Sequence, residues 1–178
     1  TPSLLTQEEL NNILSVIRSS FKVSDDAEIT LEANPDDLTS DKLNEIKALG
    51  VNRLSIGIQS FDDGVLRYLN RAHDGASSRK SFDRARAAGF NNISIDLIYA
   101  IPETDHTAWR RNIDQAVLLD PEHISSYSLT IEPKTVFGHR LKKGELTPPD
   151  DDLAATQLEM LVNTLVSSWY DQYEVSKL

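Results

Sequence analysis

The sequence contains no cysteine among its 178 residues. This absence excludes disulfide bonds and thiolate metal ligands within the chain. Long apolar runs are also missing, since no window approaches the ~20 consecutive apolar residues that span a bilayer. The first residues form neither a basic region nor an apolar signal segment. We therefore expect no membrane span and a cytoplasmic location.

Positive charge is scarce, with 18 Lys and Arg residues against 28 Asp and Glu residues and a formal net charge of −10. Such a surface repels the phosphates of nucleic acids and of anionic membranes. We therefore expect no nucleic-acid partner. The composition leaves the oligomeric state open.

The few histidines do not predict a metal site. His73, His106, His123 and His139 lie far apart in the sequence and show no HxxxH-type ligand spacing. We interpret His106 and His139 as surface or structural residues. For His73, in "LNRAH", and His123, at the start of a strand, the sequence leaves open whether the side chain faces a pocket.

The remaining pattern alternates short β-type runs with helical ones. "TQEE" at Thr6 to Glu9 is a capping box that predicts a helix up to Ser20. Strands alternating with helices of about ten residues or more indicate right-handed crossovers and a parallel sheet. The predicted class is α/β, with parallel strands at 28–33, 52–59, 92–99 and 123–129 and helices outside them at 40–49, 62–69, 77–88 and 104–119.

A weak internal repeat supports a barrel-like series of strand and helix units. "ALGVNRLSIGIQ" at 48–59 aligns with "AAGFNNISIDLI" at 87–98. Each copy contains a helix end, a glycine cap and the start of a strand. Repeated units of this kind favour a βα barrel over an irregular α+β fold.

The predicted strands have one apolar and one polar face. Side chains alternate faces along a strand, so Leu54, Ile56 and Ile58 share one face, and the other face carries Arg53, Ser55, Gly57 and Gln59. The strands at 28–33 and 92–99 repeat the pattern. A closed barrel usually fills its interior with branched apolar residues. A polar inner face therefore predicts a lumen that is wet or holds a polar ligand.

Glu32, Gln59 and Asp96 lie towards the C-terminal ends of three predicted strands, where barrels bind their ligands. Two carboxylates and an amide can accept hydrogen bonds from a ribose diol and an ammonium group. We interpret the three residues as a site for a nucleoside or an amino acid. The alternative is structural, with each polar group paired with Arg53 or with the backbone at the barrel end.

Six ordered segments carry a family resemblance: "TPSLLT", "EANPDDLT", "GVNRLSIGIQSF", "LNRAH", "AGFNNISIDLIYAIP" and "EHISSYSLTIEPKTVF". Together they resemble the radical S-adenosylmethionine proteins of the oxygen-independent coproporphyrinogen III oxidase family. The resemblance is collinear from the first residue to about Phe137. Ser60, His73 and "LTIEPKT" are more similar to the haem-chaperone branch than to the oxidases.

The resemblance implies a partial (β/α) barrel in which Glu32, Gln59, Arg71 and Asp96 contact S-adenosylmethionine. Arg71 suits the methionyl carboxylate, because a guanidinium can bind a carboxylate bidentately. Which of the other three residues contacts the ribose and which the amino group stays open. Thr1 corresponds to a family position beside the methionyl end of the cofactor.

The family also implies a [4Fe–4S] cluster held by three cysteines, and this chain has none. We therefore expect a fragment that lacks the cluster-binding N-terminus and that is inactive alone. We expect residues 1–143 to form an incomplete radical S-adenosylmethionine barrel. Residues 144–178 would form a helical extension and the start of a C-terminal region.

Two segments near the C-terminus are less informative. Leu158, Leu161, Val162, Leu165 and Trp169 are spaced for an amphipathic helix packed on the barrel, and residues 10–17 show a similar core-packing pattern. "GHRLKKGEL", from Gly138, is a short basic patch that we interpret as a solvated loop. The alternative is that its cations contact tetrapyrrole propionates.

Three functions remain open for the intact protein. The branch resemblance favours a chaperone that binds haem and passes it to a recipient protein. The alternative is an oxygen-independent oxidase that decarboxylates the propionates of coproporphyrinogen. Without the family resemblance, the residues suggest a non-radical barrel enzyme acting on a nucleoside-like ligand.

Overall fold

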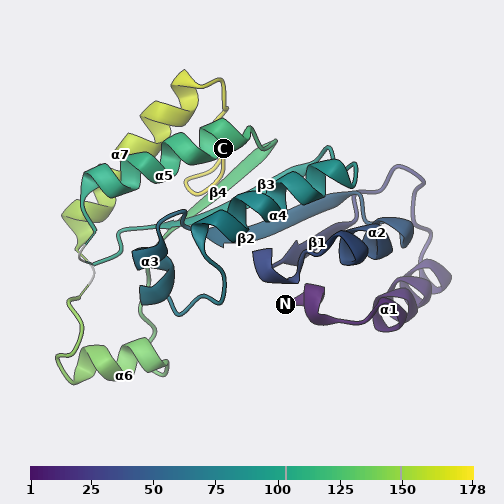
Figure 1. Ribbon diagram of the computed structural model, residues 1–178, viewed down its shortest axis with the longest axis horizontal. Helices are drawn as coiled ribbons and strands as arrows, with labels where there is room; N and C mark the ends of the chain where they lie inside the picture. The colour runs from purple at the N-terminus through teal and green to yellow at the C-terminus, as the bar shows by residue number, and fades with distance from the viewer. Residues whose placement is uncertain (103, 149) are drawn as a thin grey trace.

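The structure is a computed structural model that describes residues 1–102, 104–148 and 150–178. Its centre is a four-stranded parallel sheet (Figure 1), in the order β1 (Thr30–Ala33), β2 (Arg53–Gln59), β3 (Ile93–Tyr99) and β4 (His123–Ser128). All three neighbouring pairs are parallel. The predicted α/β class and parallel strands are confirmed, and the expected strand bounds differ from the observed ones by at most two residues.

Helices connect successive strands, as right-handed crossovers require. Each α-helix in the described chain begins after a Thr or Asp whose side chain accepts a hydrogen bond from a backbone N–H of the first turn. The predicted capping box of Thr6 and Glu9 is present. The helices are α1 (Gln7–Ser20), α2 (Ser40–Ala48), α3 (Asp63–Tyr68), α4 (Gly75–Ala87), α5 (His106–Leu119), α6 (Val136–Lys142) and α7 (Asp151–Ser167), with short 3-10 turns η1 (Pro2–Leu4) and η2 (Pro35–Asp37).

The core lies between the apolar face of the sheet and the crossover helices. Helices α2, α4 and α5 lie on this one face (Figure 1). Leu54, Ile56 and Ile58 of β2 are fully buried there. Burying such a side chain contributes about 1.5–3 kcal/mol. Burial of the apolar side chains therefore determines which face of each strand points towards the core. The opposite face is left with the polar side chains, as the alternation predicts.

The internal repeat has the predicted geometry. Gly50 and Gly89 both end a helix with positive φ, at 93° and 84°, a conformation that glycine adopts without a steric penalty. The ammonium group of Lys47, the residue just before the first copy, donates to Ala88 O of the second copy at 2.8 Å. The two copies are thus tied together at the N-terminal end of the sheet.

The last residues of the chain cover the outer edge of β4, which the sequence did not predict. Ile124 N donates to Leu178 O at 2.8 Å, and Leu178 N donates back to Ile124 O at 3.0 Å. An isolated antiparallel bridge joins Ser125 and Lys177. The edge that β4 would otherwise expose is therefore paired along its first half.

The amphipathic helix predicted near the C-terminus is α7, which packs on α5 and β3. Leu161 and Leu165 are buried as expected. Gln157 is also buried, and its Oε1 accepts from Ala100 N at 2.7 Å. The prediction for Trp169 is wrong: the helix ends at Ser167, and the indole is 97% exposed.

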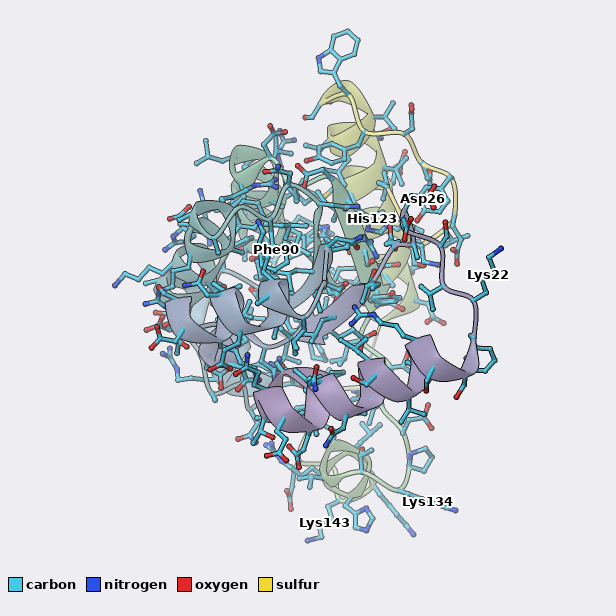
Figure 2. All side chains as sticks on the ribbon, turned by 90° about the vertical axis from the view of Figure 1, so that its right-hand side faces the viewer. Lys22, Asp26, Phe90, His123, Lys134 and Lys143 are labelled. Carbon is cyan, nitrogen blue, oxygen red and sulfur yellow. The ribbon has the colours of Figure 1, made fainter. Side chains whose placement is uncertain are left out.

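Two further helix predictions are wrong. The apolar residues of α1 do not all pack in the core, because Leu10 is buried whereas Ile13 and Ile17 are 49% and 41% exposed. The basic patch from Gly138 is only partly a loop, since its first five residues lie in α6, which begins after the cap of Thr135. Lys134 and Lys143 project outward at that end of the molecule (Figure 2). None of the helices in the described ranges has the length and apolar character of a membrane span.

Candidate functional site

The structure places Gln59 at the last position of β2, Glu32 at the next-to-last position of β1 and Asp96 in the middle of β3. Glu32 pairs in register with Ser55 of β2. Ser55 Oγ in turn lies 3.4 Å from Asp96 Oδ2 and 3.5 Å from Oδ1. The two carboxylates therefore flank one serine hydroxyl on the polar face of the sheet.

Asp96 has a perturbed carboxyl group. Burial is the main cause that raises its pKa above the ordinary value, and the charge of Glu32 raises it further. Hydrogen bonds from Ser125 and Ser55 oppose this shift. A half-buried carboxylate with a second one nearby favours a cationic or hydrogen-bond-donating ligand.

Gln59 ends β2 in a strained conformation. Its φ is 67°, and the register with β3 shifts between Ile56 and Gln59. A left-handed φ is uncommon for a residue with a side chain and occurs often at binding sites. The shift turns the Gln59 amide back over Gly57, where an added Cβ would lie 2.8 Å from Gln59 Nε2.

Arg71 reaches the same place from the segment between α3 and α4. A Cβ at Gly57 would lie 3.6 Å from Arg71 Nη2. This nitrogen donates to Asn34 Oδ1 at 2.8 Å and to Gly57 O at 3.3 Å. Gly57 therefore leaves a space that both the Gln59 amide and the Arg71 guanidinium border.

Thr1 joins this cluster through Asn34. Asn34 Nδ2 lies 3.4 Å from Thr1 Oγ1, at the end of β1. The structure thus brings Thr1, Gln59 and Arg71 together around Asn34 and Gly57, beside the pair formed by Glu32 and Asp96.

The structural alternative was that Arg53 pairs with these polar side chains. The Arg53 guanidinium does not contact Glu32, Gln59 or Asp96 directly. The Arg53 guanidinium lies 3.6 Å from Glu28 and 3.4 Å from the Thr30 hydroxyl. Its charge does lower the pKa of Asp96, as the smallest of the causes after burial, the two serines and Glu32.

The histidines do not join the site. His73 is buried, and its Nε2 donates to Ile58 O at 3.0 Å. His123 lies at the N-terminal end of β4 (Figure 2), with Nδ1 2.8 Å from Ser94 Oγ and Nε2 2.7 Å from Tyr173 OH. Burial, and then the charge of Arg53, lower its pKa. His106 and His139 are exposed.

Within residues 1–102, 104–148 and 150–178, no group of three or more His, Cys, Asp or Glu side chains is arranged to hold a metal ion. The site residues that the sequence reasoning missed are Asn34, Ser55, Gly57 and Ser125. Strand parity was the available signal for two of them, since Ser55 and Gly57 share the face of Gln59.

A protein-family model described as the Radical SAM superfamily matches residues 1–110. Two of the similar proteins are named heme chaperone HemW. The one from Bacillus subtilis is 41% identical over 99% of this chain and 47% of its own length, and the one from Escherichia coli is 36% identical over 99% and 46%. This chain spans about half the length of these relatives.

Solved structures of radical SAM proteins are also similar to this chain. Coproporphyrinogen III oxidase (HemN) from Escherichia coli, described as a radical SAM enzyme, superimposes with a TM-score of 0.87 at 27% identity, over 99% of this chain and 41% of that one. Elp3 from Methanocaldococcus infernus shares the fold, with a TM-score of 0.75 at 17% identity over 89% of this chain and 42% of that one. The predicted resemblance is confirmed, and the chain belongs to the Radical SAM superfamily.

Proposed function

We propose that this chain is part of a haem chaperone and that the polar C-terminal ends of β1, β2 and β3 bind S-adenosylmethionine. The observation that carries the chaperone assignment is the 41% identity over 99% of the chain to a protein named heme chaperone HemW. Identity to the oxidase HemN is lower, at 27%. Haem is the cargo in this proposal, and a haem-accepting protein is the expected partner.

Membership in the superfamily implies S-adenosylmethionine and a [4Fe–4S] cluster. The residues present do not fit the cluster, because its usual ligands are cysteine thiolates and the chain has no cysteine. The thiolate ligands of such a cluster do not come from these 178 residues. We therefore assign no step of the chemistry to the cluster here.

The residues do fit S-adenosylmethionine, which supplies a 5′-deoxyadenosyl radical when it is reductively cleaved. Arg71 would bind the methionyl carboxylate, because no carboxylate of the described chain lies within 4.0 Å of its guanidinium. Glu32 and Asp96 would accept hydrogen bonds from the ribose hydroxyls or the ammonium group, and Gln59 can both accept and donate. Thr1 would lie beside the methionyl end.

The other predictions about the intact protein stay proposals. They include the division at residue 143, the cytoplasmic location and contact between Arg140, Lys142 or Lys143 and tetrapyrrole propionates. Arg140 lies 3.7 Å from Glu145, and Lys143 lies 4.0 Å from the same carboxylate. Glu145 therefore partly neutralises Arg140 and Lys143.

The chaperone proposal is tested on the intact protein that carries this chain, reconstituted anaerobically with iron and sulfide. Haem is titrated in while the ultraviolet-visible spectrum is recorded, and coproporphyrinogen decarboxylation is assayed in parallel. We expect a cluster band, a stable haem spectrum and no decarboxylation. Decarboxylation that depends on S-adenosylmethionine would instead make the protein an oxidase. A protein without a cluster that still binds a nucleoside would favour the non-radical barrel enzyme.

A further inference from the structure

Asn34 lies where the chain leaves β1 and enters η2, and its amide is held in one orientation. Nδ2 lies 3.3 Å from Asp37 Oδ2, which also accepts from Ser3 Oγ at 2.6 Å. An ionised carboxylate only accepts hydrogen bonds, so the amide nitrogen must face Asp37. The amide oxygen therefore faces Arg71, whose Nη2 donates to it at 2.8 Å.

The Arg71 guanidinium that Asn34 holds is not paired with a carboxylate of the described residues. Its two acceptors, Asn34 Oδ1 and Gly57 O, are neutral and both bond the same nitrogen, Nη2. Nη1 and Nε make no hydrogen bond to the described residues. A half-buried arginine tethered through one nitrogen and not paired with an acid is ready for a bidentate carboxylate.

We propose that Asn34 is a positioning residue: it sets the Arg71 guanidinium so that the site prefers ligands with an amino-acid carboxylate over plain nucleosides. This inference rests on the proposed binding of S-adenosylmethionine at this face. Asn34 acts through Arg71 and does not need to touch the ligand. Its removal should therefore lower the affinity for the carboxylate end of a ligand and leave the affinity for the nucleoside end unchanged.

The chain contains a matched control. Asn52 precedes β2 at the N-terminal end of the sheet, where its Oδ1 accepts from Ile29 N at 2.7 Å and its Nδ2 donates to Ala27 O at 2.9 Å. Like Asn34, Asn52 uses both its amide oxygen and its amide nitrogen in hydrogen bonds, here to the segment just before β1. Its contacts are all with the backbone, far along the strands from Arg71.

The test measures the affinity of residues 1–178 for S-adenosylhomocysteine, which has the carboxylate, and for 5′-methylthioadenosine, which lacks it. Isothermal titration calorimetry is performed on the unaltered chain, on Asn34→Leu and on Asn52→Leu, with melting temperatures recorded for each. We expect Asn34→Leu to weaken S-adenosylhomocysteine binding about tenfold, as expected for disturbing one hydrogen bond to a charged group. Binding of 5′-methylthioadenosine should not change. Asn52→Leu should lower the melting temperature and leave the ratio of the two affinities unchanged.

Equal weakening of both ligands by Asn34→Leu, or no change in their ratio, would overturn the positioning role. If Asn34→Leu does not fold, Asn34→Ala removes the same acceptor without adding bulk and is judged by the same ratio. An unaltered chain that binds neither ligand would show that the proposed S-adenosylmethionine site is itself wrong, and this inference would fall with it.

Discussion

The two ends of the parallel sheet differ in the partners that they give to an arginine side chain. At the N-terminal end, Arg86 donates to Phe90 O at 3.2 Å, to Asp120 O at 2.9 Å and to Glu122 at 2.9 Å. Glu122 also accepts from Ile93 N at 2.8 Å. At the C-terminal end, Arg71 is held through a single nitrogen by two neutral oxygens.

The difference separates residues that stabilise the fold from residues that are available to a ligand. Polar groups in folded proteins normally have hydrogen-bond partners. Where the fold supplies several partners, including a carboxylate, as around Arg86, the group contributes to stability. Where it supplies few, as around Arg71, a ligand can supply the rest. This division matches the general rule that barrels bind ligands at the C-terminal ends of their strands.

The largest expected effect comes from a substitution at the C-terminal end of the sheet. Arg71→Leu should weaken binding of S-adenosylmethionine about 100-fold, because a carboxylate would lose its charged partner, a loss of about 2.7 kcal/mol. The melting temperature should fall less than in Arg86→Leu, since Arg71 makes two hydrogen bonds to neutral oxygens and no ion pair with the described residues. Calorimetric titration and thermal unfolding check the two parts. A large loss of stability with unchanged affinity would contradict the account.

The converse substitution, Arg86→Leu, removes the arginine at the N-terminal end of the sheet. It removes three hydrogen bonds, the ion pair with Glu122 and the contact with the Phe82 ring at 4.9 Å. We expect the free energy of unfolding to fall by about 2 kcal/mol, measured by urea denaturation. Affinity for S-adenosylmethionine should not change. Weakened binding in a folded Arg86→Leu protein would mean that the two ends are not independent.

Strand parity explains how much of this could be predicted. Alternation along "RLSIGIQS" separates a face of Leu and Ile from a face of polar residues, and three strands with the same alternation place Glu32, Gln59 and Asp96 at one edge. Arg71 and Thr1 came only from the family resemblance, because they lie outside the strands. The parity argument gives neighbours along the sheet, and it cannot give contacts made by connecting segments.

Other features depended on tertiary contacts that a pattern does not encode. The apolar stripe of α1 predicted burial, but a stripe does not say what covers it, and Ile13 stays half exposed. Trp169 continued the helical spacing of α7, yet it adopts a positive φ of 71° after the helix has ended. Asn34 carried no signal of its own, since its role depends on Asp37 and Arg71 meeting in space.

A smaller effect is expected from Asp96→Asn. The folded-state pKa of Asp96 is raised above the ordinary value of 3.8, mainly by burial, so its ionisation disfavours the folded state. Below that ordinary value the carboxyl is protonated in both states. As the pH rises through the folded-state pKa, the unaltered chain loses stability that the Asn variant keeps.

Asp96→Asn should therefore be more stable than the unaltered chain at pH 7, with a difference that shrinks as the pH falls towards 3.8, the ordinary Asp value. Its affinity for S-adenosylmethionine should fall about tenfold through loss of a charged acceptor. Urea denaturation at several pH values and calorimetric titration measure the two effects. A stability difference that grows towards acidic pH would contradict the assignment.

The smallest effect should follow Glu32→Gln. The charge of Glu32 raises the pKa of Asp96, but less than burial does. Removing that charge should lower the pKa of Asp96 slightly, as followed by the ¹³C chemical shift of the Asp96 carboxyl group against pH. The substitution Glu28→Gln is the control at the other end of β1. A pKa of Asp96 that does not respond to Glu32→Gln would mean that the two carboxylates do not share one site.

The most direct test of the account is an NMR titration of residues 1–178 with S-adenosylhomocysteine that follows backbone amide signals at both ends of the sheet. We predict saturable changes at Gln59, Arg71 and Asp96, with the signals of Asn52 and Arg86 unchanged. Changes centred on Asn52 and Arg86, or no change at any of the five residues at millimolar ligand, would contradict the claim that the C-terminal ends form the cofactor site.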